Sequence, residues 1–179
     1  MAVYVALLRD INVGTAKAVS MADLSAAFEN LGFGDVKTLL RSGNVIFSAT
    51  HALPADASAA IGAAVLHATG VQSSVLVIDG VDFAAIAGAN PLLEVATDGS
   101  KSFVTFVSSM PAALERPDAA GLAPEILTVG DRAVYQWMPN GSQKTRVPQS
   151  FWRQFDGPVT ARNWNTVQRL VGLLGETAP

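Results

Sequence analysis

The chain has 179 residues, of which 50% are hydrophobic, and its formal net charge is −3 with an isoelectric point near 5.2. This length suits one medium or two small domains, and the apolar content supports a packed core and excludes a disordered chain. The sequence contains no cysteine, which excludes disulfides, thiol catalysis and thiolate metal sites and fits a cytoplasmic location. The acidic balance disfavours nucleic acid as a partner.

The sequence also argues against a membrane partner and against a bound metal. No apolar stretch approaches the roughly 20 residues that a membrane-spanning helix needs, and we find no signal peptide. The two histidines, His51 and His67, have no metal-ligand spacing such as H-E-x-x-H. We therefore expect no metal and no cofactor.

The chain begins with a strand pattern followed by a helix pattern. Residues 3–8 are a β-rich apolar run, typical of a buried strand, and a polar loop follows them. Ser20 is suited to cap the next helix, and Gly32 is suited to end it. The first two elements are therefore a strand and a helix.

A hairpin, a second helix and a fourth strand complete the first half. Residues 36–41 and 45–48 have strand patterns around a tight turn. Pro54 is suited to open a helix that ends at Gly70, and residues 74–78 form another strand. The resulting order, β-α-β-β-α-β, is that of a ferredoxin-like fold.

A similar order of elements follows in the second half, after a short helix at residues 79–89. We expect a lobe over residues 1–92, a linker over 93–101 and a second lobe over 102–179. The predicted fold is α+β, with two ferredoxin-like lobes whose antiparallel sheets carry helices on one face. The predicted strands of the second lobe are 103–107, 125–129, 133–137 and 159–161, and its helices are 112–120, 148–155 and one from Asn163.

This topology predicts which polar motifs are neighbours. The end of the first strand and the turn between the second and third lie at the same end of a sheet, so residues 9–12 should lie beside residues 42–44. By the same argument residues 140–146 should approach residues 162–165. The loops between the lobes would then be the natural place for a site.

Arg9 stands at a strand end, where an arginine can pair with a carboxylate or a phosphate in a bidentate way. The alternative is a salt bridge that holds the loop, with Asp10, Asp35 or Asp131 as its partner. Both interpretations stay open from the sequence.

Two asparagines and two glycines near Arg9 have similar alternatives. Asn12 and Asn44 could hydrogen-bond a ligand or hold a turn through their own backbone. Gly14 and Gly43 would let backbone N–H groups approach an anion, with Ser42 beside them. The chain has no G-x-G-x-x-G after a strand and no P-loop, so neither common nucleotide-binding motif is present.

The C-terminal motif offers a second candidate. Asn163 is suited to cap a helix, and the free N–H groups of a helix start bind anions. Arg162 would add charge there and Asn165 a polar group, or Arg162 would pair with an acid such as Asp156. Lys144 could line the same edge or belong to a solvated loop.

These motifs together resemble a known family. The runs YVALLRDINVG, RSGNVIF and TARNWNTVQRL are similar to those of the bacterial domain of unknown function 1697 family. The resemblance implies a two-lobed α+β architecture of ferredoxin-like parts and no established activity. Asp10 and Thr15 stand where the family usually has glycine, and the extra carboxylate beside Arg9 would weaken an anion site.

The sequence shows no catalytic constellation and leaves enzymatic activity undecided. There is no G-x-S-x-G elbow, and the hydroxyls of Tyr4, Tyr135 and Ser42 have no visible activating group. The favoured function is binding of a small anionic ligand, such as a nucleotide or phosphorylated metabolite. The alternative is a non-catalytic structural or protein-interaction module whose polar motifs lock the lobes together. A second alternative is single-stranded nucleic-acid binding through aromatic residues on strands, which are Tyr4, Phe47, Phe103, Phe106, Tyr135 and Trp137.

Overall fold

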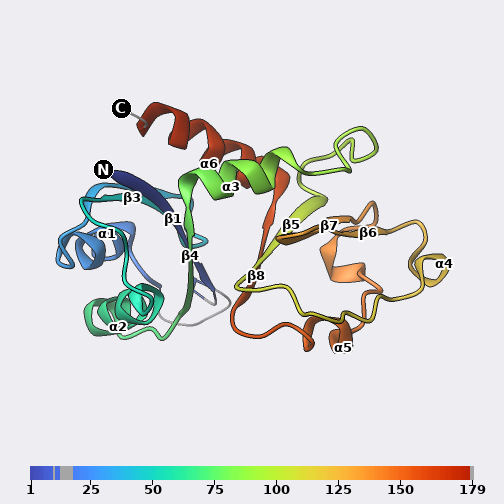
Figure 1. The fold of residues 1–179 in the computed structure, drawn as a ribbon, viewed down its shortest axis with the longest axis horizontal. Coiled ribbons are helices and arrows are strands. Elements are labelled where there is room, and N and C mark those ends of the chain that lie inside the picture. Colours follow the sequence, from blue (N-terminus) through green and yellow to red (C-terminus); the bar gives the residue numbers. More distant parts are fainter. Residues whose placement is uncertain (10, 13–17, 178–179) are drawn as a thin grey trace. The chain divides into compact units, whose positions relative to one another are not determined.

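The computed structural model describes residues 1–9, 11–12 and 18–177 of the chain (Figure 1). The chain divides into two compact units: unit 1 comprises residues 1–83 and 170–179, and unit 2 comprises residues 84–169. Each unit contains a four-stranded antiparallel sheet with helices, so the α+β fold class predicted from the sequence is confirmed. Within the described residues, no helix is long and apolar enough to cross a membrane.

The sheet of unit 1 has the strand order β2-β3-β1-β4. Its central strand β1 pairs antiparallel with β3 on one side and with β4 on the other. This is the ferredoxin-like arrangement predicted from the order of elements. The strands are β1 (Ala2–Arg9), β2 (Gly34–Leu39), β3 (Asn44–Ala49) and β4 (Ser74–Asp79).

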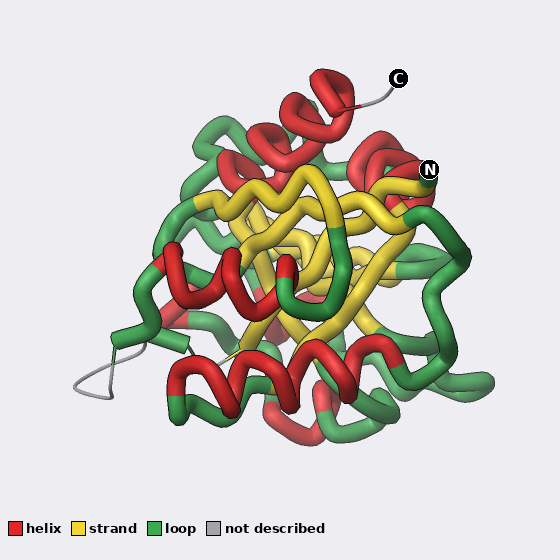
Figure 2. The backbone as a smooth tube through the Cα atoms, turned by 90° about the vertical axis from the view of Figure 1, so that its left-hand side faces the viewer, coloured by secondary structure: helices red, strands yellow, loops and turns green. Residues whose placement is uncertain are grey.

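Two helices, α1 (Met21–Glu29) and α2 (Ala57–Thr69), cover one face of this sheet. Figure 2 shows helices lying in front of strands. Ser20 caps α1 as predicted, because its side chain accepts a hydrogen bond from Asp23 N at 3.0 Å. The predicted start of α2 at Pro54 is wrong: Ala57 N donates to Pro54 O, so the proline belongs to the preceding turn.

An aromatic cluster fills the core of unit 1 between the sheet and these helices. The rings of Phe28 and Phe47 are 5.2 Å apart, and Phe33 and Tyr4 also pack on Phe47. Along their strands, Tyr4 and Phe47 alternate with side chains that point to the second face. The last turns of α6 (Trp164–Thr177) belong to unit 1 and lie near this second face, where Lys37 Nζ donates to Thr177 Oγ1 at 3.3 Å.

Unit 2 repeats the same topology with different strands. Its sheet has the order β6-β7-β5-β8, and every neighbouring pair is antiparallel. If the four strands are renumbered from the first, this order equals that of unit 1, so both units are ferredoxin-like. The strands are β5 (Ser102–Val107), β6 (Ile126–Val129), β7 (Ala133–Trp137) and β8 (Val159–Asn163).

The helices that cover the sheet of unit 2 are much shorter than predicted. The expected helix at 112–120 is wrong: the chain there is irregular, and only α4 (Ala119–Leu122) forms, with Asp118 accepting from Gly121 N at 3.2 Å. Pro117 lies inside the predicted helix, where a proline removes a hydrogen bond and clashes with the preceding turn. The expected helix at 148–155 shortens to α5 (Gln149–Trp152).

Loops and a second aromatic cluster complete the core of unit 2. Phe151 packs against Trp152 and Phe155, with ring centroids 4.8 and 5.5 Å away. Unit 2 also contains all three tryptophans of the chain. Two further helices, α3 (Gly80–Gly88) and α6, each contribute residues to both units. A 3-10 turn, η1 (Ser142–Lys144), lies in the loop after β7.

Candidate functional site

Two loops meet at one end of the unit 1 sheet: the segment that follows β1 and the turn of residues 40–43 between β2 and β3. We call this region the loop end of unit 1. Leu8 N donates to Gly43 O at 2.8 Å, so the turn lies directly against the last residues of β1. The neighbourhood of residues 9–12 and 42–44 that topology predicted is therefore present.

The side chain of Asn12 joins these two loops. Its Nδ2 donates to Arg41 O at 2.7 Å and to Val19 O at 3.2 Å, and its Oδ1 accepts from Val19 N at 2.7 Å. The backbone of Asn12 has φ +55°, in the left-handed region that asparagine tolerates better than most residues. All three bonds reach main-chain groups, so this amide connects residue 12 to residue 19 and to the β2–β3 turn.

Asn44 and Gly43 hold the turn itself. Asn44 is fully buried, and its Nδ2 donates to Leu39 O at 2.9 Å and to Ser42 Oγ at 3.1 Å. Gly43 has φ +78°, and a Cβ there would lie only 2.8 Å from Ile11 Cδ1. These hydrogen bonds of Asn44 are the kind expected of a residue that holds a turn.

Two arginines project from the loop end of unit 1. Arg9 ends β1 with an exposed side chain, and its carbonyl accepts from Ser73 Oγ at 2.7 Å. Arg41 is exposed in the turn, and its carbonyl is the one that Asn12 holds. Arg41 was not predicted as a site residue, although its place beside Ser42 in the same turn is a usable signal. Asp10, Gly14 and Thr15, which were also considered from the sequence, lie outside the described residues.

Arg162 of unit 2 has a different environment. It lies on β8 with only 9% of its surface exposed, and its Nη1 donates to Thr160 Oγ1 and to Ala161 O, both at 2.9 Å. Burial lowers the pKa of this guanidinium from its ordinary value to about 10. The Nη1 group of Arg162 thus donates to groups of its own strand.

Asn163 caps helix α6, as the sequence predicted. Its Oδ1 accepts from Thr166 N at 3.0 Å and from Thr166 Oγ1 at 2.8 Å. The next helical amide, Trp164 N, donates to Gly99 O at 3.0 Å. A Cβ on Gly99 would overlap Oδ1 of Asn165, so a larger residue at this position would require the Asn165 side chain to move.

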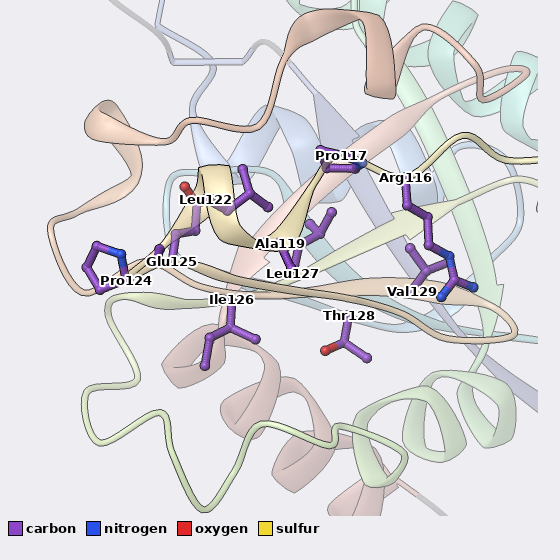
Figure 3. A pocket seen from close by; sticks show the side chains of 11 residues that line it. Arg116, Pro117, Ala119, Leu122, Pro124, Glu125, Ile126, Leu127, Thr128 and Val129 are labelled. Atoms are coloured by element: carbon purple, nitrogen blue, oxygen red, sulfur yellow. The ribbon is translucent and has the colours of Figure 1, made fainter.

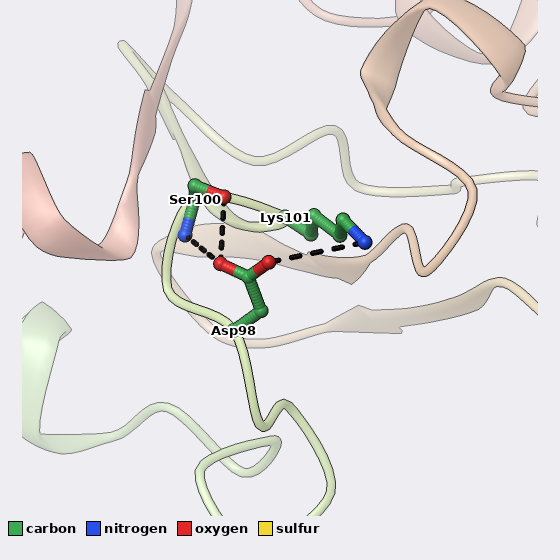
Figure 4. A network of polar contacts seen from close by, with 3 residues as sticks. All are labelled: Asp98, Ser100 and Lys101. Carbon is green, nitrogen blue, oxygen red and sulfur yellow. Dashed lines mark hydrogen bonds and ion pairs between the residues drawn. The ribbon is translucent and has the colours of Figure 1, made fainter.

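The side chain of Asp98 holds the loop that contains Gly99 through polar contacts to Ser100 and Lys101 (Figure 4). Asp98 Oδ1 accepts from Ser100 N at 2.9 Å and from Ser100 Oγ at 2.6 Å, and Lys101 Nζ lies 3.8 Å from Oδ2. The two bonds from Ser100 lower the pKa of the Asp98 carboxyl below its ordinary value. Sequence reasoning took this stretch for linker, although Asp-Gly-Ser is a common signature of an Asx turn.

Lys144 lies at the other side of the unit 2 sheet. Thr145 Oγ1 and Arg146 N bond the buried carboxylate of Glu125, just before β6, at 2.7 and 2.9 Å. The accompanying pocket, which Lys144 lines, measures about 10 Å³, enough for about one water molecule. Since β6 and β8 are opposite edges of the sheet, β7 and β5 separate the attachment of this loop from Arg162.

The two tyrosines considered for catalysis make contacts within the fold. Tyr135 OH donates to Ile86 O at 2.8 Å, and burial, followed by the charge of Asp131, raises the pKa of this phenol above its ordinary value. Tyr4 stacks on Phe47 with ring centroids 5.6 Å apart. Among the described residues, no group of three or more potential ligands is arranged to hold a metal ion.

Fold and site geometry define the class of this protein: an α+β chain of two ferredoxin-like units whose polar motifs lie on loops and helix starts. It belongs to the family described as protein of unknown function DUF1697, whose family model matches residues 1–135. The solved structure of conserved bacterial protein SP0830 from Streptococcus pneumoniae is similar, with a TM-score of 0.70 and 23% identity over 97% of this chain and 98% of that one. At this identity the likeness establishes the fold alone. No curated protein matches the chain.

Proposed function

We propose that this protein binds a small anionic ligand, such as a nucleotide or a phosphorylated metabolite, at the loop end of unit 1. The observation that carries the proposal is the three-bond attachment of Asn12, which fixes the segment after β1 against the β2–β3 turn. Both loops adjoin an exposed arginine: Arg9 ends β1 directly before one loop, and Arg41 lies in the other. Fixing the loops therefore fixes the origins of two guanidinium groups at one end of the sheet.

The chemistry of these groups favours phosphate over other anions. A guanidinium presents paired N–H donors that match two phosphate oxygens, and the exposed Ser42 can add a hydroxyl from the same turn. The proposal omits Arg162, Asn163 and Asn165. Arg162 is buried against its own strand, and Asn163 is occupied as the cap of α6.

A thermal-shift titration with phosphate, pyrophosphate, nucleotides and sugar phosphates tests the proposal. A ligand at about 100 times its Kd raises the free energy of unfolding by about 2.7 kcal/mol, which gives a clear upward shift in melting temperature. The double variant Arg9→Gln/Arg41→Gln is expected to lose the shift. Arg169→Gln, a change at an exposed arginine of α6, is the matched control and should retain it. The proposal fails if no anion at millimolar concentration stabilises the protein, or if the double variant responds like the parent.

The same hydrogen bonds also support a second candidate, a non-catalytic structural or protein-interaction module. The hydrogen bonds described above for the Asn12 and Asn44 side chains reach groups of the loop end and of Leu39, the last residue of β2. In this case, Asn12→Ala should lower the melting temperature while no anion raises that of the parent. The expectation of a site on loops between the lobes stays a prediction.

A further inference from the structure

The corresponding edge strands of the two units, β2 and β6, differ in features that hinder pairing with a further strand. Each is the second strand of its unit and forms an edge of its sheet. In β2 the exposed charges of Asp35 and Lys37, a register shift between Gly34 and Lys37 and a positive φ at Asp35 all hinder pairing with another strand. The strand β6, Ile126–Val129, has no charged residue and keeps an unbroken register with β7. It therefore lacks these protections.

The outer side of β6 presents main-chain hydrogen-bonding groups. The hairpin closes with a bond from Gly130 N to Ala133 O at 2.9 Å. Because bonded and non-bonded pairs alternate along an antiparallel ladder, Thr128 bonds β7 while the N–H and C=O groups of Leu127 and Val129 point outward. No described residue of the chain supplies a hydrogen bond to these outward groups.

A pocket of about 470 Å³ lies along this edge (Figure 3). It is formed by β6 together with the irregular segment that stands where unit 1 has helix α1. Apolar side chains dominate its lining, and the polar residues are Arg116, Glu125 and Thr128. The pocket thus offers an apolar surface directly beside unpaired strand edge.

The two charged side chains of the pocket, Arg116 and Glu125, differ in whether a ligand could pair with them. Arg116 is exposed and lies near Val129 at one end in Figure 3, and the described residues give its side chain no hydrogen bond or ion pair. Glu125 is buried, and its carboxylate already accepts from Gln136, Thr145 and Arg146. The charge that a ligand can meet is therefore positive and lies at the Val129 end.

We propose that the edge of β6 binds an extended segment of a partner protein, with alternating apolar side chains and one acidic side chain that faces Arg116. The segment would add to the sheet as a further strand, with its main chain bonded to Leu127 and Val129. A second copy of β6 fits poorly, because the strand Ile-Leu-Thr-Val has no acid to meet Arg116. A terminal carboxylate would need several amide donors, and the free amides at the start of α4 are occupied by Asp118.

Binding of labelled hexapeptides to the full chain, followed by fluorescence anisotropy, tests this proposal. The probe, called the Glu pool, is a mixture of hexapeptides with alternating apolar residues and one fixed Glu. Two further pools serve for comparison. The Gln pool has Gln in place of the Glu, and the methylated pool keeps the Glu but is N-methylated at alternate residues. We expect Arg116→Gln to weaken binding of the Glu pool about fivefold, the size of an exposed ion pair, and to leave the Gln pool unchanged. Arg153→Gln, at an exposed arginine outside the pocket, is the matched control and should bind like the parent.

N-methylation removes N–H donors from the peptide and leaves the protein intact, so it tests strand addition without a folding risk. We expect it to abolish binding, and we expect the amide NMR signals of Leu127 and Val129 to shift on addition of the unmodified Glu pool. The proposal is overturned if the Glu pool does not bind at millimolar concentration, or if the methylated pool binds equally well. Sedimentation that shows a dimer lost in Val129→Pro would also overturn it, in favour of a second copy as the occupant.

Discussion

Units 1 and 2 share one strand order but differ in what covers their sheets. In unit 1 the two covering helices, α1 and α2, have 9 and 13 residues, whereas α4 and α5 of unit 2 have 4 each. In both units an apolar, aromatic core forms beneath this cover. The comparison shows that strand order can be kept while the helical layer is reduced, provided that loops and large side chains fill the space.

The reduced helical layer also changes the surface. Between β5 and β6 the chain carries Pro111, Pro117 and Pro124, which leave room for only one helical turn. In unit 1 the corresponding connection contains α1, which contacts β2 directly. The pocket beside β6 is therefore a consequence of prolines in place of a helix.

The largest expected loss of stability comes from removing a buried ring, and its size should differ between the cores of the two units. Phe28→Ala should lower the free energy of unfolding by about 3–5 kcal/mol, since the ring is fully buried beneath α1. Phe151→Ala should cost about 3 kcal/mol, at the low end, because one-turn α5 can relax toward the cavity. Urea denaturation with hydrogen exchange in each unit measures both. A smaller loss for Phe28→Ala than for Phe151→Ala would contradict the contrast drawn between the two covering layers.

Two glycines with positive φ sharpen the comparison of turns. Gly43→Ala should cost about 3 kcal/mol, because left-handed strain adds to a Cβ contact of 2.8 Å with Ile11 Cδ1. Gly141→Ala in unit 2 should cost about 1 kcal/mol, since strain acts there alone and no atom lies within 4 Å of the new Cβ. Equal losses in urea midpoints would mean that the packing of the loop end of unit 1 contributes nothing.

The smallest expected effect concerns Tyr135 of unit 2. Because burial raises the pKa of its phenol, the folded state holds this proton more tightly than the unfolded state does. Stability from Tyr135 is therefore complete below the ordinary value of 10 and is lost as the pH rises above it. Tyr135→Phe removes the hydrogen bond to Ile86 O and should lower the free energy of unfolding by about 1 kcal/mol at neutral pH. The free energy of unfolding of this variant should fall less than that of the parent as the pH rises into the alkaline range. Parallel declines of parent and variant above pH 10 would refute this account.

Local signals in the sequence predicted much of the fold. The apolar run of β1 and the hairpin of β6 and β7 were correct, as were caps at Ser20 and Asn163, because each depends on neighbouring residues only. The prediction of a helix at 112–120 was wrong. It followed the alanine and leucine pattern of this segment, which is helical, but Pro117 is not compatible with a helix there. Competing local signals of this kind are decided by tertiary packing.

The candidate site was predicted in place but not in detail. Topology alone brought Asn12 beside the β2–β3 turn, although Arg41 is 29 residues away along the chain. Whether an amide faces a ligand or a carbonyl depends on side-chain rotamers and loop paths, which periodicity does not encode. The pocket beside β6 could not be predicted for the same reason, since it depends on how an irregular segment folds back along the strand.

The distribution of aromatic residues has a spectroscopic consequence. All three tryptophans, Trp137, Trp152 and Trp164, belong to unit 2, so intrinsic tryptophan emission is a signal of that unit alone. The longer helices α1 and α2 belong to unit 1 and weight far-ultraviolet circular dichroism toward it. An unlabelled chain thus carries a separate optical reporter for each half, and the two melting curves can be compared in a single sample.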